Sequence, residues 1–370
     1  MSPSKTTKAI LVDLIPPSMS KAESLDRLQE LEELVNTYGG MVVVKTHQRR
    51  AAPHPRTFIG PGKVEDLAKE GKELGVSLVV INDRLKPRQI YLIAEELRKV
   101  GIEVWDRLDL ILKIFSKHAK TTEARLEIEL ASIRHMGPRI YGMGMELSRQ
   151  GGGSGTRGGQ GETNTEIMKR HLSAREEKIK EHLAHCQQVR HGHQQDRKRR
   201  GLLTVAIVGY TNAGKTTLLN KLTKRKEYAA DELFATLDTR VGKMYLDSRE
   251  ILISDTIGFI QRLPPELLNA FASTLSEAME ADVLLQVVDG SDAHAIEHLK
   301  VVEEILERLG ANKKPRILAI NKMDDAKPGK PPLAFPWKGG MTEFLATVPI
   351  SAKTGKGIEE LKQAVAKSLK

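Results

Sequence analysis

One short stretch constrains the fold of this chain more than any other, the segment GYTNAGKT at residues 209–216. It matches the pattern GxxxxGK[ST], in which the backbone N–H groups of a glycine-containing loop surround the phosphates of a nucleotide. An apolar run, LLTVAIV (202–208), leads into it, and a helix-forming stretch, Lys215–Leu222, follows. A strand, a phosphate loop and a helix in this order predict an α/β fold that binds its ligand at the carboxyl ends of parallel strands.

The residues of this loop are of the types that binding a nucleoside phosphate requires. Gly209 and Gly214 let the backbone approach the phosphate oxygens, and the start of the next helix adds its positive dipole end. Lys215 is predicted to reach the β- and γ-phosphates as a catalytic cation, and Thr216 to offer its hydroxyl to Mg²⁺. The predicted nucleotide contacts run through the whole loop: Gly209, Tyr210, Thr211, Asn212, Ala213, Gly214, Lys215, Thr216 and Thr217.

A second motif, DTIG, follows the apolar run EILIS (250–254). Asp255 can hold Mg²⁺ through water, and the N–H of Gly258 can meet the γ-phosphate as a second catalytic group. Both residues would lie at the carboxyl end of a strand, where the phosphate loop also begins. The two motifs together therefore predict a nucleoside triphosphate and its Mg²⁺ at one edge of a sheet.

The switch threonine that binds Mg²⁺ should lie between these motifs, in FATLDTR (234–240). Thr236 is the predicted metal ligand, with Thr239 as the alternative, and Phe234 is a predicted nucleotide contact. The competing interpretation is that both threonines are loop hydroxyls without a ligand.

The sequence NKMD at 321–324 predicts which base is bound. Asp324 can accept hydrogen bonds from N1–H and the 2-amino group of guanine, and adenine offers neither donor, so a carboxylate here discriminates against ATP. Lys322 would lie across the base, and SAK at 351–353 would contact guanine O6. The predicted base contacts are Asn321, Lys322, Asp324, Ser351, Ala352 and Lys353. The motifs in this order predict a GTPase domain.

Two residues bear on the rate of hydrolysis. Phe259 stands where Ras-like enzymes carry the glutamine that orients the attacking water, and a phenylalanine cannot form that hydrogen bond. Intrinsic hydrolysis is therefore expected to be slow, with a partner or another residue completing the site. Asn212 stands where cation-dependent GTPases use an asparagine to help bind K⁺, which makes it a candidate catalytic residue; the alternative is a hydrogen bond that stabilises the loop.

The pattern of apolar and polar residues divides the whole chain into three expected domains. Residues 1–107 alternate strand-like and helix-like stretches, which predicts a small parallel-sheet α/β domain. Residues 108–196 carry apolar residues at helical spacing over 108–133 and again from Ile167, which predicts a long antiparallel helical hairpin. Its tip would be the glycine-rich loop at 151–161, and residues 197–370 would form the Ras-like P-loop GTPase domain.

Charge gathers in the middle of the chain. The net charge is +10, and between residues 134 and 200 there are 14 lysines and arginines against 7 aspartates and glutamates. Such clustering indicates a polyanionic partner, although a solvated lysine-rich helix is the alternative. The pattern GxGxxG at 153–158 lacks a preceding strand, so it does not predict a dinucleotide site. We expect the loop to contact RNA with Arg157, Lys169 and Arg170, the alternative being a plain linker.

Cysteine usage and hydropathy bear on location. The single cysteine, Cys186, fits a reducing cytoplasm, and no apolar run reaches the roughly 20 residues that cross a bilayer. The first residues show no secretory signal. The expected location is the cytoplasm.

Several stretches resemble one family, the HflX GTPases of the Obg–HflX group. They are TFIGPGKVEDL (57–67), the segment at 104–131, the glycine loop with Glu162, and the motifs FATLD and DTIGF. The resemblance implies an N-terminal α/β domain, a helical subdomain and a GTPase domain. It also implies ribosome-stimulated hydrolysis of GTP to GDP with Mg²⁺, binding to the large ribosomal subunit and its rRNA, and separation or rescue of ribosomes under stress. We expect a monomer away from the ribosome.

A nucleotide-gated binding protein with negligible turnover is the competing hypothesis. In it, GTP would order the switches and tune affinity for an RNA or a protein. Phe259 supports this alternative because it removes the usual water-orienting side chain. Turnover measured with ribosomal subunits present would separate the two.

Overall fold

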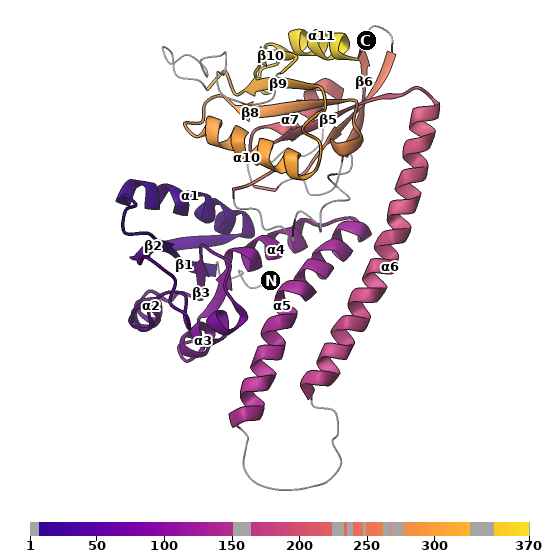
Figure 1. The fold of residues 1–370 in the computed structure, drawn as a ribbon. Helices are drawn as coiled ribbons and strands as arrows, with labels where there is room; N and C mark the ends of the chain where they lie inside the picture. The colour runs from indigo at the N-terminus through magenta and orange to yellow at the C-terminus, as the bar shows by residue number, and fades with distance from the viewer. Residues whose placement is uncertain are drawn as a thin grey trace, which may run out of the picture. The chain divides into compact units, whose positions relative to one another are not determined.

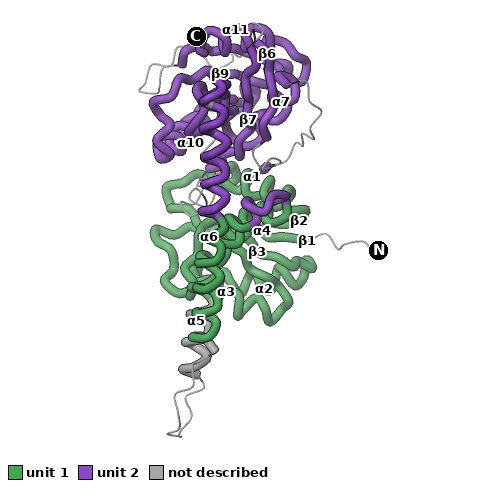
Figure 2. Tube along the Cα trace, turned by 90° about the vertical axis from the view of Figure 1, so that its right-hand side faces the viewer, with its two compact units in different colours: residues 1–117, 126–182 green, residues 118–125, 183–370 purple. Residues whose placement is uncertain are grey.

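A computed structural model of the protein describes residues 7–150, 164–223, 233–234, 240–246, 249–261, 267, 275, 278–325 and 344–369. They form two compact units, which Figure 2 shows in different colours. Unit 1 holds residues 1–117 and 126–182, and unit 2 holds residues 118–125 and 183–370. The division passes through three helices and differs from the domain limits expected at 107/108 and 196/197, which stay a prediction.

Unit 1 contains a four-stranded parallel sheet of order β2-β1-β3-β4 (Figure 1). In the central strand β1, residues 9–12 are fully buried, as expected of a strand that is covered on both faces. The expected α/β domain with a small parallel sheet is confirmed. Its elements are β1 (Thr7–Ile15), α1 (Lys21–Tyr38), β2 (Gly40–Arg49), α2 (Pro61–Leu74), β3 (Leu78–Ile81), α3 (Pro87–Arg98) and β4 (Glu103–Asp106).

Single residues set the ends of these helices. Ser20 caps α1: its hydroxyl accepts a hydrogen bond from Glu23 N (3.2 Å), and the Glu23 carboxylate accepts one from Ser20 N (2.8 Å). Pro61 and Pro87 stand in the first turns of α2 and α3, where a missing N–H costs nothing. Gly39 ends α1 with a φ of +96°, a conformation that favours glycine.

The helical stretch expected over 108–133 is two helices, α4 (Arg107–His118) and α5 (Thr122–Gln150). The break falls just before α5, where the Thr121 hydroxyl accepts a hydrogen bond from Ala124 N (3.2 Å) and so caps the new helix. Buried residues continue on both sides of the break, so the apolar spacing did not reveal it. The expectation of one continuous helix was wrong at this point.

The polar end of β4 forms a buried cluster with α5 inside unit 1. Asp106 and Asp109 cap α4 by reciprocal hydrogen bonds to each other's backbone N–H, of 2.8 and 3.0 Å. Arg139 of α5 donates to Asp109 (2.7 Å) and to Asp106 (2.6 Å). His135 Nε2 lies 3.2 Å from Asp106 Oδ1 and 3.1 Å from Asp109 Oδ1. Charge-assisted hydrogen bonds therefore attach this part of α5 to the carboxyl edge of the sheet.

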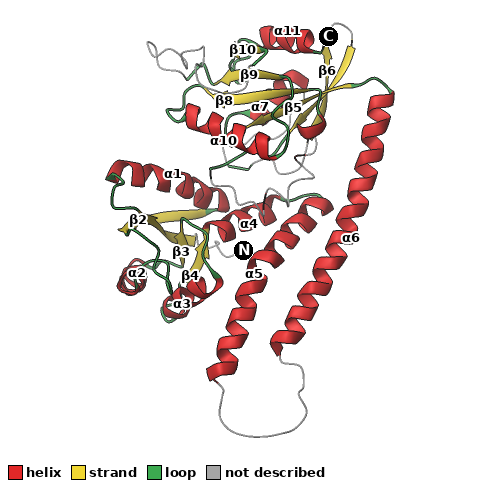
Figure 3. Ribbon diagram, viewed as in Figure 1, coloured by secondary structure: helices red, strands yellow, loops and turns green. Residues whose placement is uncertain are grey.

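Helices α5 and α6 (Asn164–Arg199) run antiparallel and side by side (Figure 3). Within unit 1, Arg175 donates two hydrogen bonds to Glu129 (2.6 and 2.7 Å), and Arg134 Nε donates to Glu176 Oε1 (3.0 Å). These pairs are solvent-accessible, so they set the register of the helices more than they stabilise the fold. The expected helical hairpin is confirmed, and its glycine-rich loop lies outside the described residues.

Unit 2 contains a six-stranded sheet of order β10-β9-β8-β5-β7-β6, in which β6 pairs antiparallel with β7 and the other pairings are parallel. Buried residues of α7 and α11 pack on one face and those of α10 on the other. This is the expected Ras-like arrangement. The elements are β5 (Leu203–Gly209), α7 (Lys215–Thr223), β6 (Arg240–Leu246), β7 (Arg249–Asp255), β8 (Val283–Asp289), α10 (Ala295–Arg308), β9 (Arg316–Asn321), β10 (Ala346–Pro349) and α11 (Ile358–Ser368).

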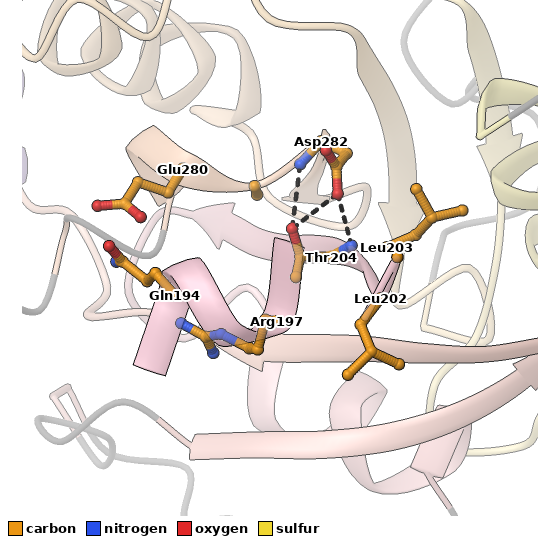
Figure 4. A pocket seen from close by; sticks show the side chains of 9 residues that line it. Gln194, Arg197, Leu202, Leu203, Thr204, Glu280 and Asp282 are labelled. Carbon is orange, nitrogen blue, oxygen red and sulfur yellow. Dashed lines mark hydrogen bonds between the residues drawn. The ribbon is translucent and has the colours of Figure 1, made fainter. Parts of the chain in front are cut away.

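A pocket lies at the amino-terminal end of β5, opposite the phosphate loop (Figure 4). Gln194 and Arg197 from the end of α6 line it, together with Thr204 and Asp282. The Asp282 carboxylate accepts hydrogen bonds from Thr204 N (2.7 Å) and Thr204 Oγ1 (2.9 Å). These two polar residues of the pocket are therefore bonded to each other. None of the predicted site residues lines this pocket. No helix in the described part of the chain combines the length and the apolar composition that crossing a bilayer requires.

Candidate nucleotide-binding site

The phosphate loop lies between β5 and α7, and its two glycines are required by close contacts. A Cβ on Gly209 would lie 2.3 Å from the carbonyl oxygen of Val287 in β8. Gly214 has a φ of +89°, and a Cβ there would lie 2.2 Å from Asn321 Nδ2. Neither position admits a side chain, which is the local reason for the spacing of glycines in the motif.

Lys215 and the acidic residue of the second motif lie close together at the start of α7. The Lys215 ammonium is buried and donates to the carbonyl oxygen of Tyr210 (2.7 Å). Burial lowers the pKa of Lys215 to about 8, and the nearby negative charge of Asp255 opposes that shift. A phosphate group placed against this amine would raise the pKa again, so the site favours an anion.

Thr216 and Asp255 offer the oxygen ligands that Mg²⁺ prefers. The Thr216 hydroxyl donates to Asp255 Oδ2 (2.7 Å), so the two oxygens lie next to each other. Asp255 is fully buried at the end of β7, where a cation would balance its charge. The donor set therefore fits the metal that the sequence predicts. Thr236 and Thr239 lie outside the described residues.

The segment after Asp255 is held against the phosphate loop by its backbone. Phe259 N donates to Gly209 O (3.1 Å), and Thr211 N donates to Phe259 O (2.8 Å). A Cβ on Gly258 would lie 2.9 Å from Lys215 Nζ, so this glycine permits close contact with the lysine. The Phe259 side chain is fully buried.

Asn321, predicted to contact the base, joins the ends of two other segments. Its Nδ2 donates to Ala213 O in the phosphate loop (2.9 Å), and its Oδ1 accepts from Ala352 N (2.9 Å). The side chain is buried, so its amide links the phosphate loop to the SAK segment. The sequence motif did not reveal this structural task.

The other predicted base contacts lie at the same edge of the sheet. Asp324 is exposed, and a hydrogen bond with Ser351 lowers the pKa of its carboxyl group, which keeps it ionised as an acceptor. Lys322 has a φ of +60°, and its ammonium lies 2.7 Å from Asp289 Oδ2. Sequence reasoning missed Asp289, although it follows the apolar run of β8 in the same way that Asp255 follows β7. Lys353 is exposed beside Ala352.

The remaining predicted site residues lie as follows. Asn212 is exposed with a φ of +59°, which an asparagine adopts more readily than most residues. Phe234 is buried, and Thr217 is half-buried in the first turn of α7. Lys169 and Arg170 are exposed on α6 in unit 1, and Arg157 lies outside the described residues.

Comparison with known proteins identifies the family. The chain is 43% identical over 318 residues to a GTPase HflX of Caldanaerobacter subterraneus subsp. tengcongensis, covering 86% of this chain and 72% of the relative. It is 37% identical to GTPase HflX of Escherichia coli, covering 98% of this chain and 83% of the relative. The chain belongs to the HflX family of GTPases. As a member of that family it is a GTP-binding P-loop GTPase, which confirms the expectation from its motifs.

Family models and a solved structure agree with the HflX assignment. Models described as GTP-binding GTPase N-terminal, GTP-binding GTPase Middle Region and 50S ribosome-binding GTPase match residues 25–116, 118–200 and 204–322. The crystal structure of SsGBP in complex with GDP has a TM-score of 0.54 and 26% identity, covering 98% of both chains. The chain's fold thus resembles that of a protein solved with GDP bound.

Proposed function

We propose that this chain hydrolyses GTP slowly by itself and faster on the large ribosomal subunit, and that hydrolysis drives a cycle of binding and release. The cycle would separate or rescue ribosomes under stress, in the cytoplasm. The observation that carries the proposal is the full burial of Phe259. The proposed site offers groups for the phosphates and the base, but its residue at the usual glutamine position cannot orient water, so a partner would complete this step.

Individual residues would share the chemistry. Lys215 and the N–H of Gly258 would stabilise the charge of the transferred phosphoryl group, and Asn212 would help to hold K⁺. Thr216, Asp255 and Thr236 would hold Mg²⁺, which supplies positive charge to the β- and γ-phosphates when bound. The other proposed GTP contacts are Gly209, Tyr210, Thr211, Ala213, Gly214, Thr217, Phe234, Asn321, Lys322, Asp324, Ser351, Ala352 and Lys353.

The charge of the helical hairpin supports an RNA partner. Lys169 and Arg170 are exposed at the first turns of α6, which begins directly after the glycine-rich loop. Together with Arg157 they would contact rRNA phosphates, and the glycines would let the backbone approach the RNA closely. One of the matching family models is described as a 50S ribosome-binding GTPase, which favours the large subunit as the source of this RNA.

The proposal is tested by GTP turnover at saturating GTP, with and without purified large subunits, in K⁺ and in Na⁺ buffers. We expect turnover to rise by at least about tenfold with subunits, since completing a catalytic site removes more than about 1.4 kcal/mol of barrier. Loss of activity in Na⁺ would support Asn212 as a K⁺ ligand. Tight GTP binding with turnover that subunits leave unchanged would contradict the proposal and favour a nucleotide-gated binding protein.

A further inference from the structure

Tyr210, the second residue of the phosphate loop, contacts both the segment after Gly258 and helix α10. Its side chain is buried, with 6% of its surface exposed. Its backbone takes part in a parallel bridge with Phe259 and accepts the hydrogen bond from Lys215 Nζ. The phenol ring extends from this point toward α10, so the residue joins three parts of unit 2.

The ring of Tyr210 stacks on the imidazole of His298. The ring centroids are 3.7 Å apart and the planes meet at 9°, so the two rings are nearly parallel. His298 lies in the first turns of α10, and its Nδ1 is 3.2 Å from Asp292 Oδ2. Asp292 in turn accepts a hydrogen bond from His294 N (2.9 Å). The imidazole is therefore oriented from behind by a carboxylate, and it gives the tyrosine ring a fixed support.

The hydroxyl of Tyr210 reaches the segment that follows Gly258. It accepts a hydrogen bond from Gln261 N at 2.7 Å. With the two backbone bonds of Phe259, this gives three hydrogen bonds between the phosphate loop and residues 259–261. The backbone just after Gly258 is thus held at both ends of a short extended stretch, beside Lys215.

If Tyr210 served only to fill space, its ring would be needed but its hydroxyl oxygen would not. A phenylalanine would fill the same volume and stack on His298, yet it would leave the Gln261 N–H without this acceptor. Since the proposed chemistry depends on the Gly258 N–H facing the γ-phosphate, movement of residues 259–261 would misdirect it.

We propose that Tyr210, supported by the stacked ring of His298, is a positioning residue for GTP hydrolysis, because its hydroxyl fixes the backbone that carries the Gly258 N–H. The inference rests on the proposed hydrolysis of GTP by this chain. Tyr210 acts through the Gly258–Gln261 segment, and its side chain does not touch the reacting atoms.

The first test compares Tyr210→Phe with Tyr245→Phe, a matched control in β6 whose ring is 66% exposed. We expect Tyr210→Phe to lower kcat by about five- to tenfold, the worth of one hydrogen bond, while KM and GDP affinity change by less than about twofold. The nucleotide contacts proposed for the Tyr210 backbone are not altered by this substitution. A kcat equal to that of the control, or a loss of GDP affinity matching the loss of rate, would overturn the inference.

The second test asks whether His298 acts through Tyr210. His298→Gln removes the stacked ring and is expected to lower kcat as well. In the double variant with Tyr210→Phe, the two effects should overlap, so that kcat falls no further than about twofold below the lower single variant. Effects that multiply in full would show that the residues act independently, which contradicts the pairing.

Amide hydrogen exchange of the GDP-bound protein separates this inference from the proposed function. Tyr210→Phe should speed exchange of the Gln261 amide by at least about fivefold, with the exchange of β5 unchanged. A parent chain that shows no GTP turnover contradicts the proposed function, and exchange then decides alone whether Tyr210 holds the segment. Unchanged exchange at Gln261 would contradict the inference even in an active enzyme.

Discussion

At the scale of single residues, the burial of Lys215 decides what the phosphate loop can bind. Its ammonium is desolvated, and the carbonyl of Tyr210 together with the charge of Asp255 offsets part of that cost. An anion at the loop relieves the same cost more fully. The affinity for phosphate therefore arises partly from the desolvated cation of Lys215, which a bound anion would stabilise.

This burial predicts a pH dependence of nucleotide binding. With its pKa lowered to about 8, Lys215 of the nucleotide-free protein loses its proton as the pH rises through that value. A bound phosphate raises the pKa again, so binding above pH 8 takes up a proton, and GDP affinity should fall by up to about tenfold per pH unit. Fluorescence titration between pH 7.0 and 9.0 measures it. Lys215→Arg is the control, because its side chain stays charged over this range while the guanine base still ionises as before. Equal slopes of GDP affinity against pH in the two proteins would contradict the prediction.

At the scale of elements, a cluster of four side chains attaches α5 to the sheet of unit 1. Asp106 is fully buried and Asp109 and Arg139 nearly so, and the guanidinium lies against both carboxylates. The oxygens of these aspartates and His135 Nε2 have the spacing of a metal site. Arg139 already places a cation there, so the cluster holds two helices and a strand together by its own charges.

Removing the arginine should therefore be costly. Arg139→Met would leave the buried carboxylates without their cation, and we expect a loss of about 3–5 kcal/mol in the free energy of unfolding. Urea denaturation of the full chain, followed by circular dichroism, measures it. Arg134→Met is the control on the same helix: it removes an accessible pair with Glu176 and should cost less than about 1 kcal/mol. A similar cost for both variants would contradict this account.

The histidine of the cluster gives stability a pH dependence. Burial by itself lowers the pKa of His135, but hydrogen bonds with Asp106 and Asp109 outweigh it and raise the pKa above 6.5. A group with a raised folded pKa stabilises fully below its unfolded pKa, about 6.5, and this stabilisation is lost as the pH rises through the folded value. We expect the parent to lose more stability than His135→Gln between pH 6 and 8.5. If the free energy of unfolding, measured by urea denaturation, changed with pH equally in the two proteins, His135 would not be the group responsible.

At the scale of the whole molecule, the proposed cycle links a nucleotide site in unit 2 to a basic helix that begins in unit 1. The helix α6 is continuous across the division between units at 182/183, so it is one of the covalent connections between the two regions. Its exposed cations at the first turns would supply the electrostatic part of RNA binding.

The RNA contact predicts an effect that depends on position along α6. Arg170→Glu should weaken cosedimentation with large subunits by about tenfold and lower the dependence on salt by about one ion, because it removes a phosphate contact. Lys178→Glu makes the same kind of charge change at an exposed position further along the helix and should have a smaller effect. Equal losses would show that the helix acts by general charge and would contradict a contact at Arg170.

Much of this protein was predictable from short stretches of its sequence. The phosphate loop, DTIG, NKMD and SAK each follow a strand, so the β–loop–α pattern placed them at one edge of a sheet before any tertiary contact was known. The family resemblance rested mainly on other stretches, among them residues 57–67 and 104–131, and the helical hairpin was predicted from its apolar spacing. These features are local, because each can be recognised from residues that are close together in the sequence.

The tertiary structure alone decided how distant residues share the work. Asn321 joins Ala213 to Ala352, and Tyr210 stacks on His298, 88 positions further along the chain. The break between α4 and α5, where the Thr121 hydroxyl caps α5, falls within apolar spacing that continues on both sides. The sequence determined which chemistry the chain carries, because each motif is contiguous. Only folding decided which side chains hold those motifs in place, because such contacts depend on which strands and helices become neighbours in space.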